Sequence, residues 1–372
     1  MMLAYFQNKR VLLTGAAGFI GRTLLAELLS LPEGQRPVEV VCLDHDEGAM
    51  FNLQRKYADE VRVISMLGDV RDLSRVRSAC EQIDVVIHAA GLKHVSLCET
   101  SPTDAVSTNI LGLQNVIEAA REARVDTVLF TSSDKAVNPT NVMGTSKLMG
   151  ERLISAANHT QRGRGPVFAT CRFSNVIGSD GLVDSHFRRQ VIAGGPVTVT
   201  DSSIVRFFMG RKEAAVAILK AAGMARGGEV LVPLSRSVRI RELAEAMVRK
   251  LAPLHGKEAA AIEISEIGLR PGEKNAEDLV SREEARRTIA CEGFYSILPA
   301  FSGFYRQIEY QYPGASDEAA IGEAYRAESQ EVLTAEQLAE FLQEEGAFSA
   351  AAGTDEQTAS GTYWPGDTPL AG

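Results

Sequence analysis

Short apolar runs alternate with segments of helical periodicity along the first half of the chain. The runs that we predict to be strands are Val11–Thr14, Val38–Leu43, Val61–Ser65, Val85–His88, Thr127–Phe130 and Val167–Cys171. Segments with the helical repeat lie between them, among them Ile20–Leu29, Val106–Ala123 and Lys147–Ala157. Strands without a polar face, separated by helices, are typical of a parallel sheet that is covered on both faces. We therefore predict an α/β fold with a doubly wound parallel sheet.

The regular alternation of strand and helix patterns ends after Asn175, where the predicted elements become shorter and glycine and proline become more frequent. We expect one domain over residues 1–175 and a smaller domain over residues 176–311, partly interleaved with the first. The smaller domain should close over the carboxyl ends of the strands, where doubly wound folds bind ligands. Residues 312–372 form an acidic extension. In it we predict a helix at Leu333–Leu342 and disorder over about the last twenty residues, which are rich in glycine, threonine and proline.

The composition narrows the class of protein. The 372 residues are 45% hydrophobic and carry a formal net charge of −9, which allows a sizeable core and lacks the basic surface that nucleic-acid binding requires. The cysteines are scattered and lie mostly in apolar runs, as reduced core thiols do: Cys42, Cys80, Cys98, Cys171 and Cys291. No apolar run of the sequence is long enough to cross a membrane. We expect a cytoplasmic protein without membrane insertion.

A glycine-rich loop joins the first predicted strand to the first predicted helix. In Gly15-Ala-Ala-Gly18-Phe19-Ile20-Gly21 the glycines permit a tight turn and let a pyrophosphate approach the amino end of the helix. Asp44 ends the second predicted strand, and a carboxylate there can accept hydrogen bonds from both ribose hydroxyls of an adenosine. The pattern predicts a dinucleotide site and favours NAD over NADP. Arg55 and Lys56 lie nearby and would meet the extra phosphate of NADP, which keeps that cofactor as the alternative.

Two further loops complete the expected cofactor site. Asp69 and Val70 follow the third predicted strand and would flank the adenine. Ala89, Ala90 and Gly91 follow the fourth, where small residues let the backbone pass close to the cofactor.

The segment Thr131–Lys147 carries the candidate chemistry. Asp134 and Lys135 follow the fifth predicted strand, so a buried strand delivers a carboxyl group and an amine to one loop. Lys147 lies one helical turn after Met143, on the same helix face. Met143 occupies the position of the tyrosine in the Tyr-x-x-x-Lys pair of short-chain dehydrogenases, and a thioether is not a useful acid or base. Any reaction at this loop must proceed without the phenol.

These motifs together give the chain a specific resemblance. Over residues 9–279 it resembles the extended short-chain dehydrogenases/reductases of the polysaccharide-biosynthesis (CapD-like) type, in particular UDP-N-acetylglucosamine 4,6-dehydratases. The segments that carry the resemblance are His88–His94, Thr131–Lys135, Val137–Asn141, Arg172–Gly178, Arg206–Met209 and Gly268–Lys274. It implies a Rossmann domain that binds NAD and a smaller domain that binds the UDP-sugar. It also implies a redox-neutral reaction in which a hydride leaves C4, C5 loses a proton, the C6 hydroxyl leaves as water, and the hydride returns to C6.

The resemblance assigns roles to the reactive loop, and their chemistry is reasonable. Lys135 is the expected base for the C5 proton, with a pKa lowered toward neutrality. Asp134 is the expected acid, a carboxyl group that holds a proton and gives it to the departing C6 hydroxyl. Lys147 would bind the nicotinamide ribose, and Ser132 or Ser133 would lie near the C4 hydroxyl.

The second half of the chain is expected to bind the nucleotide. Arg206 and Arg270 would hold the diphosphate, since guanidinium groups match phosphates in bidentate geometry. Glu273 would accept from the uridine ribose hydroxyls. Three further candidates for substrate contacts follow strand ends: Lys93 and His94 for the sugar, and Asn175 for a phosphate. No histidine, cysteine, aspartate or glutamate grouping has the spacing of a metal site, so we predict no metal.

Three functions stay open. An NAD-dependent UDP-sugar epimerase, acting at C5 or C4, would use the same cofactor and Lys135, but Asp134 favours water loss, and a C4 epimerase would ordinarily require the tyrosine that Met143 replaces. A non-catalytic NAD-sensing protein would have no need of the reactive loop.

We expect a homo-oligomer, because helices that flank such sheets commonly pack between subunits. The chain begins directly with the dinucleotide-binding segment, so we expect either a soluble form or a shortened one.

Overall fold

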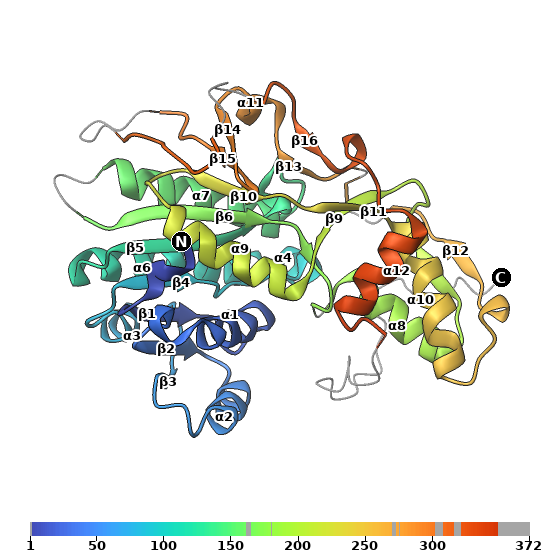
Figure 1. Cartoon of the computed structure of the whole chain (residues 1–372), viewed down its shortest axis with the longest axis horizontal. Helices are drawn as coiled ribbons and strands as arrows, with labels where there is room; N and C mark the ends of the chain where they lie inside the picture. The colour runs from blue at the N-terminus through green and yellow to red at the C-terminus, as the bar shows by residue number, and fades with distance from the viewer. Residues whose placement is uncertain are drawn as a thin grey trace.

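Among the residues that the structure describes, a sheet of nine strands forms the centre of the protein (Figure 1). The computed structural model describes residues 2–160, 165–179, 181–269, 273–274, 276–301, 308–315 and 321–348. The strands of the sheet are β1 (Arg10–Thr14), β2 (Glu39–Asp44), β3 (Val63–Leu67), β4 (Val85–His88), β5 (Thr127–Ser133), β6 (Val167–Phe173), β10 (Val230–Pro233), β14 (Thr288–Cys291) and β15 (Phe294–Ile297).

The strand order is that of a doubly wound fold. It runs β14-β15-β10-β6-β5-β4-β1-β2-β3, and every pair from β10 to β3 is parallel. The last two strands, β15 and β14, add antiparallel at one edge. Because β2 and β4 lie on opposite sides of β1, the chain reverses direction across the sheet there, which is where such folds bind ligands. The predicted fold class is confirmed.

Helices cover both faces of the sheet. One face is covered by α1 (Phe19–Ser30), α2 (Glu47–Lys56) and α9 (Arg211–Met224), with Leu24, Leu25 and Leu28 of α1 fully buried. The other is covered by α3 (Leu73–Ala79), α6 (Gly112–Ala123) and α7 (Val142–His159), with Leu113, Val116 and Ile154 in the core. Full burial of such a side chain contributes roughly 1.5–3 kcal/mol. Because one side of each helix packs into one of these two cores, apolar residues recur in the sequence with the period of a helix.

A second lobe lies beyond the carboxyl ends of the parallel strands (Figure 1). Its helices α8 (Val183–Ala193), α10 (Ile240–Leu254) and α12 (Ala335–Glu344) share one core that includes Phe187, Leu243 and Leu338. The remaining strands pair as β11 (Arg236–Arg239) with β9 (Val205–Met209) and β7 (Asn175–Val176), β8 (Val197–Val199) with β12 (Ile264–Glu266), and β13 (Asp278–Val280) with β16 (Tyr325–Arg326). The described fold also contains the short α-helices α4 (Val95–Thr100), α5 (Pro102–Ala105) and α11 (Arg282–Ala285), and several 3-10 helices.

Several predicted boundaries shift. Helix α7 begins at Val142 rather than Lys147, because the Asn141 side chain caps it by accepting from the Gly144 N–H at 2.8 Å. The predicted helix Val106–Ala123 starts with a π-helical stretch, Val106–Leu111, before α6. The predicted helix near the carboxyl end is α12, and the last residues, expected to be disordered, lie outside the described part. No helix among the described residues is long and apolar enough to cross a membrane.

Candidate functional site

A cavity of about 640 Å³ opens at the carboxyl ends of β1, β4 and β5. Both halves of the chain contribute to its walls, as expected for the ligand-binding edge of a doubly wound sheet. Most of the residues singled out in the sequence line it: Gly15, Gly18, Phe19, Ile20, Gly21, Ala89, Gly91, Lys93, His94, Ser132, Ser133, Lys135, Met143, Lys147, Asn175, Arg206 and Glu273.

The loop between β1 and α1 has the shape that a dinucleotide needs. Gly15 has a φ of +67°, and a β-carbon on it would lie 2.6 Å from the Ala90 nitrogen. A β-carbon on Gly21 would lie 2.1 Å from the Gly15 oxygen. Gly18 begins α1 without a side-chain cap, so backbone N–H groups of the first turn are available to an anion. The loop therefore fits a pyrophosphate at the amino end of α1.

Four predicted cofactor residues are not among the described residues that line the cavity: Asp44, Asp69, Val70 and Ala90. The Asp44 carboxylate accepts from the Ala17 N–H at 3.0 Å and so holds the glycine loop directly. The carboxylate has further lone pairs that can accept hydrogen bonds from ribose hydroxyls. Asp69 pairs with Arg71 at 2.5 Å, and Val70 is buried. Of these four residues, Asp44 is the one with a hydrogen bond to the glycine loop.

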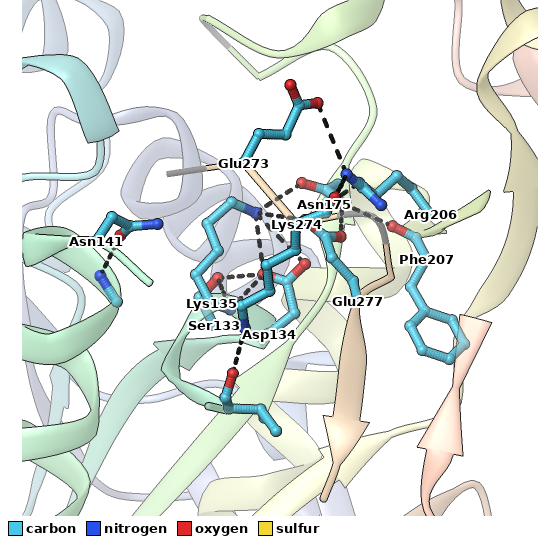
Figure 2. Close-up of polar contacts among 12 residues, drawn as sticks. Ser133, Asp134, Lys135, Asn141, Asn175, Arg206, Phe207, Glu273, Lys274 and Glu277 are labelled. Atoms are coloured by element: carbon cyan, nitrogen blue, oxygen red, sulfur yellow. Dashed lines mark hydrogen bonds and ion pairs between the residues drawn. The ribbon is translucent and has the colours of Figure 1, made fainter. Parts of the chain in front are cut away.

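A group of charged side chains meets at the end of β5 (Figure 2). Lys135 Nζ lies 3.1 Å from Asp134 Oδ1 and 3.6 Å from Glu277 Oε1, and it donates to Asn175 Oδ1 at 3.2 Å. Ser133 Oγ donates to Asp134 Oδ1 at 2.5 Å. Glu277 also pairs with Arg206 at 3.4 Å. The reactive loop is thus in direct contact with a segment more than a hundred residues away in the sequence.

The pKa shifts of Lys135 and Asp134 are opposite in direction to those expected from the sequence. Burial alone would lower the pKa of Lys135, but the carboxylates of Asp134 and Glu277 outweigh it and raise the pKa. Burial alone would raise the pKa of Asp134, but Lys135, Glu277 and Ser133 together lower it. The expectations of a lowered pKa for Lys135 and a protonated Asp134 are therefore wrong for this arrangement. Glu277 was not among the predicted site residues, and no spacing pattern in the chain points to it.

The pKa of Glu277 is raised, as was expected for Asp134. Its burial, followed by the nearby Asp134 carboxylate, raises its pKa, and Lys135 and Arg206 only partly oppose this. Two carboxyl groups in contact cannot both ionise easily, so one of them keeps a proton. The directions of the two pKa shifts favour Glu277 as the group that keeps it.

The predicted substrate residues on the second lobe surround Arg206. This side chain is 8% exposed, lies 3.7 Å from Glu273 and donates to the Lys274 carbonyl. Glu273 also accepts from Thr200 Oγ1 at 3.0 Å, and Asn175 Nδ2 donates to Glu277 at 3.2 Å. Arg270 lies outside the described residues.

Lys147 is an unusual buried lysine. It is 8% exposed, its Nζ donates to the Thr131 carbonyl at 3.0 Å, and it lies 4.9 Å from the centre of the Phe130 ring. Burial lowers its pKa to about 8. Met143, one turn earlier, is 3% exposed and packs against Cys98 and Ala105 on the cavity wall. An apolar group thus occupies the position of the missing phenol.

Ser132 lines the cavity, but its hydroxyl group belongs to a buried network. Its Oγ donates to Glu151 at 2.7 Å, and Glu151 pairs with Arg172, which pairs in turn with Glu284 at 2.8 Å. Arg172 is fully buried and also donates to the Leu279 carbonyl at 2.9 Å. This buried network joins β5 to the segment that carries Glu277. Arg172 was predicted only as part of a motif, and neither Glu151 nor Glu284 was predicted.

The described residues contain no group of three or more histidine, cysteine, aspartate or glutamate side chains placed to hold a metal ion. All five cysteines are buried and free, which confirms their prediction as core thiols.

Comparisons with known proteins agree with this architecture. The model of the family described as "Polysaccharide biosynthesis protein" matches residues 11–299. A "UDP-N-acetylglucosamine 4,6-dehydratase (inverting)" of Campylobacter jejuni is 33% identical, over 79% of this chain and 84% of its own length. A "UDP-glucose 4-epimerase" of Rickettsia felis is 32% identical, over 91% of this chain and 96% of its own length.

Solved structures show the same fold. Pen from Bacillus thuringiensis is 34% identical with a TM-score of 0.81, covering 91% of this chain and 98% of its own. MoeE5 in complex with UDP-glucuronic acid and NAD is 25% identical with a TM-score of 0.58, covering 72% of this chain and 88% of its own. The chain therefore belongs to the polysaccharide biosynthesis protein family of extended short-chain dehydrogenases/reductases, with nucleotide-sugar dehydratases and epimerases among its relatives.

Proposed function

We propose that the protein is an NAD-dependent dehydratase that converts UDP-N-acetylglucosamine, or a close UDP-sugar, to a 4-keto-6-deoxy sugar. The observation that carries this proposal is the group of Asp134, Lys135 and Glu277 on one side of the cavity. Loss of water across C5 and C6 needs a base for C5 and an acid for the C6 oxygen, close together. An amine and two carboxyl groups in mutual contact can supply both. The Campylobacter relative supports the substrate class.

The cofactor in this proposal is NAD. Gly15, Gly18 and Gly21 would hold the pyrophosphate, Asp44 the adenosine ribose, and Lys147 the nicotinamide ribose. The chemistry that NAD supplies when bound is removal of a hydride from C4 and its return to C6. The Asp44 carboxylate favours NAD, since it would repel the 2′-phosphate of NADP.

Arg206 and Glu273 are proposed to bind the nucleotide end of the substrate, together with Arg270. Arg206 has carboxylate and carbonyl partners in the described structure, so a diphosphate would exchange for some of them. Lys93, His94 and Asn175 would contact the sugar and its phosphate.

Lys135 is proposed to remove the C5 proton. Its amine must first be neutral, which two facing carboxylates oppose. A proton on Glu277 removes one of those negative charges and thereby makes the neutral amine more accessible. Asp134 and Asn175 then hold the amine in one place, with contacts at 3.1 and 3.2 Å. Ser133 or Ser132 would contact the C4 hydroxyl, although the Ser132 hydroxyl already donates to Glu151.

A UDP-sugar epimerase is the second candidate, and the Rickettsia relative is the observation that favours it. Met143 does not separate the two, because both reactions begin with oxidation of C4, the step that the missing tyrosine would ordinarily serve. The charged group at β5 favours the dehydratase, since inversion at C4 needs neither a base for C5 nor an acid for the C6 oxygen. A non-catalytic NAD-sensing protein would be the third possibility, and it would have no use for the charged group at β5.

Proton NMR of the purified protein with UDP-N-acetylglucosamine in D₂O separates the candidates. A new C6 methyl signal, together with loss of the C4 proton signal, supports the dehydratase. Inversion at C5 or C4 without a methyl signal would show an epimerase, and an unchanged panel of UDP-sugars would contradict both. We also propose a cytoplasmic location, which five free and buried cysteines support. The homo-oligomer is a further proposal that light scattering can test.

A further inference from the structure

The two carboxyl groups beside Lys135 differ in their access to the cavity. Glu277 is among the described residues that line it, and its side chain is 10% exposed. Asp134 is not among them, and its side chain is 1% exposed. In Figure 2 the Asp134 carboxyl group lies close to its own loop, whereas Glu277 approaches Lys135 from the segment that bears Lys274. A substrate in the cavity would meet Glu277 before Asp134.

The hydrogen-bond partners of Asp134 are those of an anion. Its Oδ1 accepts from Ser133 Oγ at 2.5 Å, from the Lys135 N–H at 2.9 Å and from Lys135 Nζ at 3.1 Å. Three donors on one oxygen stabilise the charged carboxylate. Asp134 therefore has little tendency to hold the proton that an acid must give.

Glu277 is placed to hold that proton. Its carboxyl group and that of Asp134 both lie next to Lys135 Nζ, at 3.6 and 3.1 Å, and two carboxyl groups held so close together do not both ionise easily. The remaining neighbours of Glu277 are Lys135 at 3.6 Å, Arg206 at 3.4 Å and Asn175 Nδ2 at 3.2 Å. Burial and the Asp134 charge raise the pKa of Glu277, in agreement with this placement.

We propose that Glu277, rather than Asp134, is the acid that gives its proton to the departing C6 hydroxyl, with Asp134 as a positioning residue behind it. This inference rests on the proposed dehydratase function. Lys135 takes the C5 proton, the electrons of the C5–H bond form the C5=C6 bond, the C6–O bond breaks, and the oxygen leaves as water with the proton of Glu277. The proton set free when the C4 hydroxyl becomes a ketone passes to solvent before water loss, and Glu277 takes a proton from solvent after the water has left. Lys135 returns its proton to C5 when the hydride reaches C6.

The substitution Glu277→Gln tests the acid directly. Glutamine keeps the shape and the neutral charge of a protonated glutamate but has no proton to give. With UDP-N-acetylglucosamine in D₂O, we expect water loss to fall by about 10²–10⁴-fold, the usual contribution of a general acid. Exchange of the C5 proton should persist within about tenfold, because Lys135 and the C4 oxidation are intact. The 6-deoxy-6-fluoro analogue should still release fluoride, since fluoride leaves without needing that proton.

Two variants serve as controls. Glu273→Gln changes the other glutamate of the cavity, which contacts Arg206 and Thr200, and should weaken binding of the hydroxyl and fluoro substrates equally. Asp134→Asn should slow C5 exchange and both eliminations together, because it disturbs the position of Lys135. A readout without substrate is the infrared band of a protonated carboxyl group at neutral pH, which should be present in the native protein and missing from Glu277→Gln.

The inference is overturned if Glu277→Gln loses water at the native rate, or if it loses C5 exchange and fluoride release along with water loss. It is also overturned if the selective loss of water release appears in Asp134→Asn instead. Retained C5 exchange shows that the variant is folded. If the native protein itself forms no 6-deoxy product from any UDP-sugar, the proposed function fails, and that outcome is distinct from native turnover with an unimpaired Glu277→Gln.

Discussion

Replacing Arg172 with methionine tests how the two halves of the chain are held together. The guanidinium group is fully buried and donates to both oxygens of Glu151 at 2.7 and 2.9 Å, and to both oxygens of Glu284 at 2.8 and 3.0 Å. A further bond of 2.9 Å reaches the Leu279 carbonyl. These contacts join β6 to α7 and to α11. Methionine fills similar space without the charge and without the donors.

The expected loss of stability is large. Removing one partner of a buried ion pair costs about 3–5 kcal/mol of unfolding free energy, because it leaves an uncompensated charge. Two carboxylates lose their partner here, but either can take up a proton, so we expect about 3–5 kcal/mol at pH 7 rather than twice that amount. Typical domains have about 5–15 kcal/mol in all. The variant should unfold at a clearly lower urea concentration.

The loss should depend on pH in a defined direction. Burial alone would raise the pKa of Glu284, but Arg172 outweighs it and brings the pKa to about 2. In the native protein this group therefore stabilises the fold above its ordinary pKa, and that stability is lost only as the pH falls toward 2. Without Arg172, burial raises the pKa instead, so the carboxylate destabilises the fold at neutral pH and ceases to do so once protonated. The difference between native and variant should shrink as the pH falls from 7 toward about 4.

Far-UV circular dichroism during urea unfolding, repeated at several pH values, gives the measurement. Arg77→Met is the matched control, because Arg77 also pairs with two glutamates, Glu118 and Glu122, both at 2.7 Å, but is 45% exposed. Exposed pairs contribute little, so its unfolding midpoint should stay close to the native value. The reasoning is refuted if Arg172→Met loses no more stability than Arg77→Met, or if its loss is the same at pH 7 and pH 4.

Three further outcomes are expected. Gly21→Ala should abolish NAD binding, because its β-carbon would lie 2.1 Å from the Gly15 oxygen, whereas Gly34→Ala, which meets nothing within 4 Å, should bind NAD normally in a calorimetric titration. Lys147→Met should abolish turnover yet raise the urea midpoint of unfolding at pH 7, because it removes a buried charge. The pKa of Lys147 in the native protein, about 8, lies below the ordinary value for lysine, so this gain in stability should shrink as the pH rises from 8 toward 10. Met143→Tyr should speed the oxidation of C4 in single-turnover absorbance measurements, because it restores a phenol one turn from Lys147, and an unchanged rate would show that the phenol has no role here.

The sheet could be predicted from the sequence because its inner strands are buried on both faces. Strands such as Val85–His88 contain no exposed position, so their apolar runs are continuous. The strand β3 was placed two residues too early, because it lies at the edge of the sheet and Val61 is 93% exposed. The strand β10 was not identified at all. It is short and follows a helix in the second half of the chain, where no regular alternation marks it as part of the central sheet.

The cofactor loop and the reactive loop could also be predicted, since each consists of neighbouring residues with a fixed spacing. The charges in the site could not. The protonation of Asp134 and Lys135 depends on Glu277, which reaches them only through the packing of the second lobe. A pKa is determined by neighbours in space, and sequence spacing contains no information about a neighbour that arrives from a distant segment.

The buried network around Arg172 holds in place the two carboxyl groups of the site, those of Asp134 and Glu277. Glu151 binds Ser132, two residues before Asp134, and Arg172 binds the carbonyl of Leu279, two residues after Glu277. One guanidinium group therefore fixes both backbone segments whose side chains must share a proton. A shift of either segment by the length of a hydrogen bond would separate the carboxyl groups, lower the pKa of Glu277 and leave the C6 oxygen without its acid. The stability of the Arg172 network and the protonation of Glu277 should accordingly change together, so that Arg172→Met retains C5 exchange better than it retains water loss.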